Sequence, residues 1–202
     1  NWYAPDLTRE RETGLATTPL AEIVQLLRTG ASRQAQTSGP MAEVVQHGTQ
    51  FMTEADLQAM AVYLQSRALK PSTAGPEPAK AKPRLEVALM GRQIYERHCE
   101  QCHGAQGQGK STPNGQMAYP PLAGNRAVLL GDPTNLVQVV LYGGYGPDTQ
   151  WHPRPFGMPP ALLELDDRDI SAVLTHLRTQ WGNQASEVTP LQVNRIRAAQ
   201  GR

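Results

Sequence analysis

Apolar residues recur at helical spacing along several stretches of the chain, and most of these stretches carry end signals. In TPLAEIVQLLRTG (18–30), Ile23, Leu26 and Leu27 share one helical face, and a glycine closes the stretch. The same reasoning predicts further helices over 53–67, 86–98, 132–144, 166–180 and 189–201, the last of them lying on the surface. No alternating pattern predicts a sheet, so the chain is expected to be all-α.

A proline-rich segment, ALKPSTAGPEPAKAKPR (68–84), interrupts the helical pattern. Four prolines interleaved with alanine and lysine favour an extended, semi-rigid linker over a packed element. The chain is therefore divided into residues 1–67 and 85–202.

The two regions contain an internal repeat. AEIVQLLRTGAS (21–32) matches TNLVQVVLYGGY (134–145), and each copy continues into a Pro/Gly turn with a methionine, Met41 or Met158. An acid-capped helix then follows in both copies. The front of the second region, 85–131, has no counterpart in the first. Residues 1–67 are therefore expected to be the back half of a module that is complete in 85–202.

Composition narrows the classes of function. Nineteen basic and 18 acidic side chains give a formal net charge of +1, which argues against a nucleic-acid binder. No apolar stretch approaches the roughly 20 residues that span a bilayer. The start, NWYAPDLTRE, does not read as a signal peptide. An exported protein would therefore have lost its signal or carried it on a longer precursor.

The strongest motif is ERHCEQCH (96–103), in which Cys99, Cys102 and His103 form C-x-x-C-H. This is the attachment signature of c-type haem, because two thiols at this spacing reach both vinyl groups of one porphyrin. The next residue, His103, is then held below the iron. A structural zinc site needs four ligands and finds no second cysteine pair, and a thioredoxin-type pair needs a βαβ context.

An electron-transfer haem needs a sixth ligand, and methionine commonly accompanies histidine. Met158 is the candidate, because the prolines of PRPFGMPP stiffen its loop. The alternative is a loop methionine packed on apolar surface. Met117, His98 and His152 are weaker candidates, expected to be packing or solvated side chains.

Residues 85–202 resemble a class I cytochrome c domain, through the helix before C-x-x-C-H, the YPPLAGN loop, the FGMPP loop and the last helices. In that family the first and last helices cross closely. Gly91 is expected at this crossing, with Tyr95 packing towards Leu174 and Leu177.

The family also has a loop proline whose carbonyl accepts a hydrogen bond from the proximal histidine. The resemblance assigns this part to Pro120 or Pro121, with an ordinary turn as the alternative, and it places Tyr119 and Pro121 at the haem.

The wider set of motifs resembles the multihaem cytochrome c subunit of membrane-associated periplasmic dehydrogenases, whose members carry three cytochrome c domains. The resemblance implies that residues 1–67 match the back half of the second domain and 85–202 the third. Met41 then matches the axial methionine of a haem attached upstream. A chain without that attachment site is a fragment, or a half-domain held against a partner, and in this chain alone Met41 should bind no iron.

The expected function is electron transfer through one covalent haem c with His103 and Met158 as iron ligands, and not catalysis by the isolated chain. The resemblance implies a flavin, quinone or molybdenum dehydrogenase as donor and a quinone or oxidase as acceptor. It also implies the periplasm, with a possible contact to the outer face of the cytoplasmic membrane. The alternatives are a free-standing single-haem shuttle, a peroxidase or gas binder with a labile Met158, and an assembly module in which 1–67 docks a partner.

Overall fold

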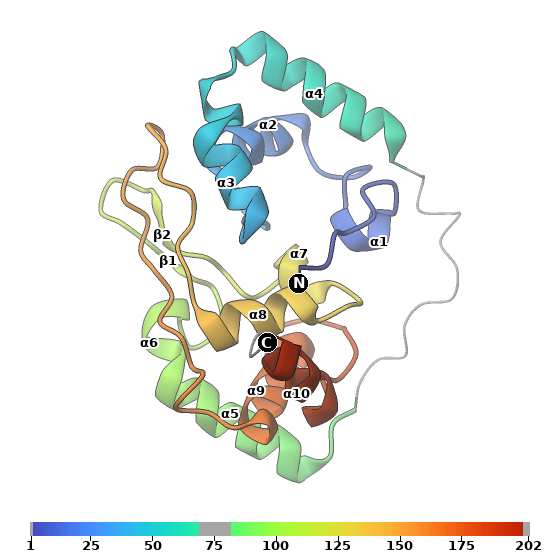
Figure 1. Cartoon of the computed structure of the whole chain (residues 1–202), viewed down its shortest axis with the longest axis vertical. Coiled ribbons are helices and arrows are strands. Elements are labelled where there is room, and N and C mark those ends of the chain that lie inside the picture. The colour runs from blue at the N-terminus through green and yellow to red at the C-terminus, as the bar shows by residue number, and fades with distance from the viewer. Residues whose placement is uncertain (1, 69–81, 200–202) are drawn as a thin grey trace. The chain divides into compact units, whose positions relative to one another are not determined.

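The structure, a computed structural model, describes residues 2–68 and 82–199, and these fall into two compact units (Figure 1). Unit 1 comprises the described residues of 1–3, 78–144 and 158–202, and unit 2 those of 4–77 and 145–157. The linker predicted over 68–84 lies almost entirely outside the described residues. No helix in the described part of the chain has the length and apolarity to cross a bilayer.

Unit 1 is helical, as predicted. Its helices are α5 (Leu85–His98), α6 (Glu100–His103), α7 (Arg126–Leu129), α8 (Thr134–Tyr142), α9 (Asp167–Thr179) and α10 (Pro190–Ala199). Two short antiparallel strands, β1 (Lys110–Ser111) and β2 (Met117–Tyr119), form a ribbon that the sequence did not predict. Strands this short contain too few positions to show an alternating pattern.

Helices α5 and α9 pack against each other (Figure 1). Their close approach at Gly91 is as predicted. A Cβ atom at Gly91 would lie only 2.3 Å from the carbonyl oxygen of Ala172. Tyr95, one turn further along α5, is 2% exposed and shares the core with Leu174 and Leu177. Its ring also contacts Trp181, with centroids 4.9 Å apart.

Helix α10 lies on the surface, as predicted, but it is anchored to the core through one buried side chain. Val193 is fully buried in the core that includes residues of α8 and α9, and Ile196 packs against the same core. Arg197 forms an ion pair with Asp167 at 2.7 Å. A small number of apolar residues is enough to anchor a helix that packs on two others. The sequence pattern alone does not reveal the groove in which such a helix packs.

Unit 2 contains α1 (Glu10–Thr13), α2 (Leu20–Thr29), α3 (Pro40–His47), the 3-10 helix η1 (Thr49–Phe51) and α4 (Glu54–Arg67). Helices α2 and α4 pack through Ile23, Val24, Leu57 and Ala61. Residues 145–157, which precede Met158 in the sequence, belong to this unit.

Segment 145–157 is fastened to unit 2 by specific contacts. A Cβ atom at Gly30 would lie 2.1 Å from Cγ of Pro147, so only glycine permits this approach. Gln50 donates from Nε2 to the carbonyl of Asp148 at 3.2 Å and accepts from the backbone N–H of Gln150 at 3.1 Å. The sequence pattern divided the chain at the linker alone. It did not predict that residues 145–157 belong to unit 2.

The internal repeat recurs in local geometry. Helix α4 begins with a capping box of Thr53 and Asp56, and α9 with one of Asp166 and Asp169. Helices α2 and α8 both end at a glycine with positive φ, 75° at Gly30 and 65° at Gly143. The ends of α2 and α8 and the starts of α4 and α9 therefore lie at matching positions, whereas α3 of unit 2 has no helical counterpart in the described residues between α8 and α9.

A polar side chain in the last turns of α4 and α9 makes matching hydrogen bonds in both copies, and it is half-buried in α4 and fully buried in α9. Arg178, which is fully buried, donates at 2.7 Å to the carbonyls of Val128 and Leu130. Its counterpart Gln65 donates to the carbonyls of Leu15 and Thr18, at 3.1 and 2.9 Å. In both units this side chain fastens the helix to the segment that precedes the repeat.

Candidate functional site

The C-x-x-C-H motif lies where α5 gives way to the short helix α6. Cys99 caps α6, and its backbone N–H bonds back to Tyr95 of α5 at 2.9 Å. Tyr95 in turn donates from its hydroxyl to the carbonyl of Gly104 at 2.5 Å, so the same tyrosine holds both ends of the motif. The position of the motif is therefore set by the core of unit 1.

Both thiols are free. Cys99 packs against the core, and burial raises the pKa of its thiol to about 11. A redox or nucleophilic cysteine works as a thiolate and has a lowered pKa. The environment of Cys99 therefore argues against the thioredoxin-type alternative.

His103 is oriented for metal binding by one hydrogen bond. Its Nδ1 lies 2.9 Å from the carbonyl oxygen of Pro120, so Nδ1 carries the proton and donates. Burial lowers the pKa of His103, and the bond to Pro120 only partly offsets this effect. A neutral imidazole protonated at Nδ1 presents the Nε2 lone pair as a ligand.

The histidine's partner is Pro120, which resolves the choice between the two prolines. The carbonyl of Pro121 instead accepts from Nδ2 of Asn125 at 2.8 Å, so Pro121 does not orient His103. The loop approaches closely because position 109 is glycine. A Cβ atom there would lie 2.6 Å from the carbonyl oxygen of Tyr119. The glycine-rich GAQGQG that follows the motif was the signal for this approach.

Tyr119 lies beside the attachment cysteines, at the end of β2. Its hydroxyl shares a hydrogen bond with the thiol of Cys102. Burial and the neighbouring Cys102 together raise the pKa of the Tyr119 phenol, which keeps it protonated. The described contacts place Tyr119 at the motif, while Pro121 contacts the next turn of the same loop.

Met158 is held at the end of α8 by a pair of backbone hydrogen bonds. Gly144 donates to the carbonyl of Met158 at 3.1 Å, and Met158 donates to the carbonyl of Gly144 at 2.8 Å. A Cβ atom at Gly143 would lie 2.3 Å from the Met158 carbonyl oxygen. Met158 also packs against the core of unit 1. The sequence predicted a stiff loop from its prolines, but it did not predict this bridge.

The other residues considered as iron ligands lie in different environments. His98 is exposed to solvent, as expected, and its Nδ1 lies 3.6 Å from a carboxylate oxygen of Glu164. His152 bonds with Thr149 in the segment that belongs to unit 2. Met117 lies on β2. Met41 lies in the first turn of α3 and is 51% exposed.

The residues present fit a c-type haem. One free thiol lies at the N-cap of a short helix and the other within it, and the adjacent histidine carries its proton on Nδ1. Within the same unit, a methionine is fixed by its backbone. Two thioether bonds from cysteines, one imidazole–iron bond and one methionine–iron bond are what a haem c with His/Met ligation requires of its protein.

Comparisons with known proteins identify the family. The family model for cytochrome c matches residues 88–181. The cytochrome c subunit of the alcohol dehydrogenase (quinone) of Gluconacetobacter polyoxogenes is 33% identical over 204 residues, covering 98% of this chain and 42% of the relative. The gluconate 2-dehydrogenase cytochrome c subunit of Pantoea cypripedii is 30% identical, covering 97% of this chain and 45% of the relative.

A smaller relative matches about half of the chain. Cytochrome c-552 of Thermus thermophilus is 38% identical over 96 residues, which cover 46% of this chain and 69% of the relative. The chain thus spans less than half the length of the dehydrogenase subunits, 42% of the first and 45% of the second. With the family model, the smaller relative and the geometry of the motif in agreement, the chain belongs to the cytochrome c family.

Proposed function

We propose that the chain carries electrons through one covalently attached haem c in unit 1. The observation that carries this proposal is the bond from His103 Nδ1 to Pro120, which leaves Nε2 as a ready iron ligand beside two free thiols. A haem bound here would supply reversible one-electron chemistry at its iron.

The chain's own residues would hold and tune that group. Cys99 and Cys102 tether it, His103 binds from one side, and Met158 closes the other side. With both axial positions filled by the protein, no substrate needs to reach the metal. The Pro120 carbonyl increases the basicity of His103, which makes it a better donor to iron.

We propose a dehydrogenase as the electron donor. The two long relatives are named as cytochrome c subunits of an alcohol dehydrogenase (quinone) and a gluconate 2-dehydrogenase. By this likeness the donor is a flavin, quinone or molybdenum dehydrogenase subunit, and the acceptor is a quinone or an oxidase. The chain itself is an electron-transfer subunit and not the catalyst. Covalent haem attachment occurs outside the cytoplasm, which supports a periplasmic site beside the membrane's outer face.

We further propose that unit 2 is the back half of a second cytochrome c module. In unit 1, α9 presents Ala172 and His176 to Gly91 of α5. The corresponding positions of α4 are Ala59 and Tyr63, and both are exposed, Tyr63 by 65%. This face of α4 is suited to receive a first helix that carries its own C-x-x-C-H. Met41 would then be the axial ligand of that second haem.

The near-infrared spectrum of the oxidised chain, matured with a c-type haem attachment system, tests the proposed ligands. We expect the methionine–iron charge-transfer band in the wild type and its loss in Met158→Ala. The matched control is Met117→Ala, which should keep the band. A wild-type spectrum without the band would contradict the proposal and would favour an open site of the peroxidase or gas-binding type.

A further inference from the structure

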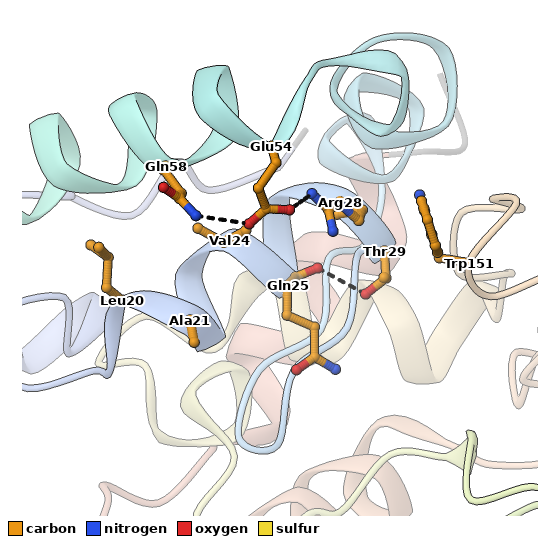
Figure 2. A pocket seen from close by; sticks show the side chains of 9 residues that line it. All are labelled: Leu20, Ala21, Val24, Gln25, Arg28, Thr29, Glu54, Gln58 and Trp151. Atoms are coloured by element: carbon orange, nitrogen blue, oxygen red, sulfur yellow. Dashed lines mark hydrogen bonds and ion pairs between the residues drawn. The ribbon is translucent and has the colours of Figure 1, made fainter.

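Unit 2 contains a groove of about 550 Å³ between α2 and α4. Leu20, Ala21 and Val24 line it with apolar surface (Figure 2). Arg28 and Glu54 form an ion pair across it, and Figure 2 shows this pair bridging the two helices. Trp151, contributed by segment 145–157, stands at the end of the groove that is nearer to Arg28 (Figure 2).

The internal repeat shows what fills the corresponding groove of unit 1. Helix α10 packs there against both α8 and α9. Tyr142 donates from its hydroxyl to the carbonyl of Arg197 at 3.5 Å, and the Arg197 guanidinium pairs with Asp167 at 2.7 Å. Asn194 also donates to Asp167, at 2.9 Å. Tyr142 is the last residue of α8, and Asp167 is the first residue of α9.

The matching residues of unit 2 line the open groove. Thr29 is the last residue of α2 and Glu54 the first of α4, so they correspond to Tyr142 and Asp167. Both line the groove in unit 2. Among the described residues of unit 2, no helix packs on α2 and α4 as α10 packs on α8 and α9. The helix that completes this groove in one copy of the repeat is therefore missing from the described part of the other.

The residues that line the groove include the apolar and polar groups that a docked helix would contact. Ala21 is exposed, Leu20 beside it is half-buried, and Trp151 is 52% exposed, whereas Val24 belongs mainly to the core of unit 2. The Glu54 side chain is 55% exposed although Arg28 and Gln58 donate to it, so its carboxylate can accept a further bond. The Arg28 guanidinium lies 5.2 Å from the centroid of the Trp151 ring, which fixes the cation at one end.

We propose that this groove docks one amphipathic helix of a partner protein, with an aliphatic side chain on Leu20 and Ala21. About one turn further along, a basic or amide side chain of that helix reaches Glu54. The spacing is taken from α10, where Val193 enters the core while Asn194 and Arg197 reach Asp167. The seat requires neither bound haem nor electron transfer.

Amide chemical shifts of the reduced, haem-loaded full chain test this seat, with a helix-stapled peptide of residues 189–199 as the probe. The peptide should shift amides of α2 and α4 in the wild type. Ala21→Arg places a charge in the groove and should weaken binding by about tenfold or more. Ala55→Arg alters an exposed alanine of α4 outside the groove and should leave binding unchanged. A peptide with Val193→Asp should not bind.

The pattern of shifted amides distinguishes a supporting result from a contradicting one. Shifts on α2 and α4 that Ala21→Arg abolishes and Ala55→Arg retains support the helix seat. Shifts confined to α8 and α9 would mean that the peptide only exchanges with α10, and this would overturn the proposal. Binding that is equally strong in Ala21→Arg, or no shift at all, would overturn it as well.

Discussion

Replacement of Gly91 by alanine should weaken the crossing of α5 and α9. The added Cβ would lie 2.3 Å from the Ala172 carbonyl oxygen, 2.8 Å from its carbon and 3.0 Å from Cβ of His176. The nearest atoms are backbone, so they cannot rotate away. Ordinary contact begins near 3.4 Å, and the helices must therefore separate by roughly 1 Å at the crossing.

The expected loss is the difference between two opposing effects. Overpacking of this kind costs about 1–3 kcal/mol, and a clash with backbone belongs at the upper end. Alanine in a helix interior regains about 1 kcal/mol over glycine. The free energy of unfolding should therefore fall by about 1–2 kcal/mol, and Gly91→Val should lose more because its branched side chain is larger.

Urea unfolding of the haem-loaded chain, followed by Soret absorbance, measures this loss. The midpoint should fall while the slope of the transition stays constant. Gly131→Ala is the matched control, because a Cβ at Gly131 meets nothing within 4 Å. A Gly91→Ala chain as stable as the wild type would refute the close crossing.

Three further changes probe the interior of unit 1. Arg178→Met leaves the carbonyls of Val128 and Leu130 without their buried donor and should lower the free energy of unfolding in urea by about 3 kcal/mol or more. Arg178→Gln introduces the residue found at the matching position 65 and should lower it by roughly half as much. Tyr95→Phe leaves the Gly104 carbonyl without its buried donor and should lower stability by about 1–2 kcal/mol, and an unchanged midpoint would show that this bond is unimportant. Burial acts to raise the pKa of Asp167, but hydrogen bonds from α10 hold it below 3.8, so the difference in Tm between wild type and Asp167→Asn should persist at neutral pH and shrink as the pH falls through this lowered pKa.

The sequence predicted those features that depend on local signals. Helix ends followed from caps, as at Thr53 with Asp56, and the motif of Cys99, Cys102 and His103 could be recognised from spacing alone. The crossing at Gly91 followed from the family resemblance and is confirmed. Each of these features is set by residues close together in sequence or by a fixed spacing.

Features that depend on distant contacts could not be predicted. Helix α10 has a sparse apolar face, and only the groove between α8 and α9 explains why Val193 is buried. The choice of Pro120 over Pro121 depends on the path of the loop past Gly109. Segment 145–157 belongs to unit 2 through contacts such as that of Gly30 with Pro147, which no local pattern encodes.

The intact mass of the denatured chain, after expression with a c-type haem attachment system, tests the central claim most directly. The chain of 22.1 kDa should gain the mass of one haem that denaturation does not remove, and a variant with both Cys99→Ala and Cys102→Ala should gain none. A wild-type mass that stays at 22.1 kDa would contradict covalent haem attachment, and with it the electron-transfer function proposed for this site.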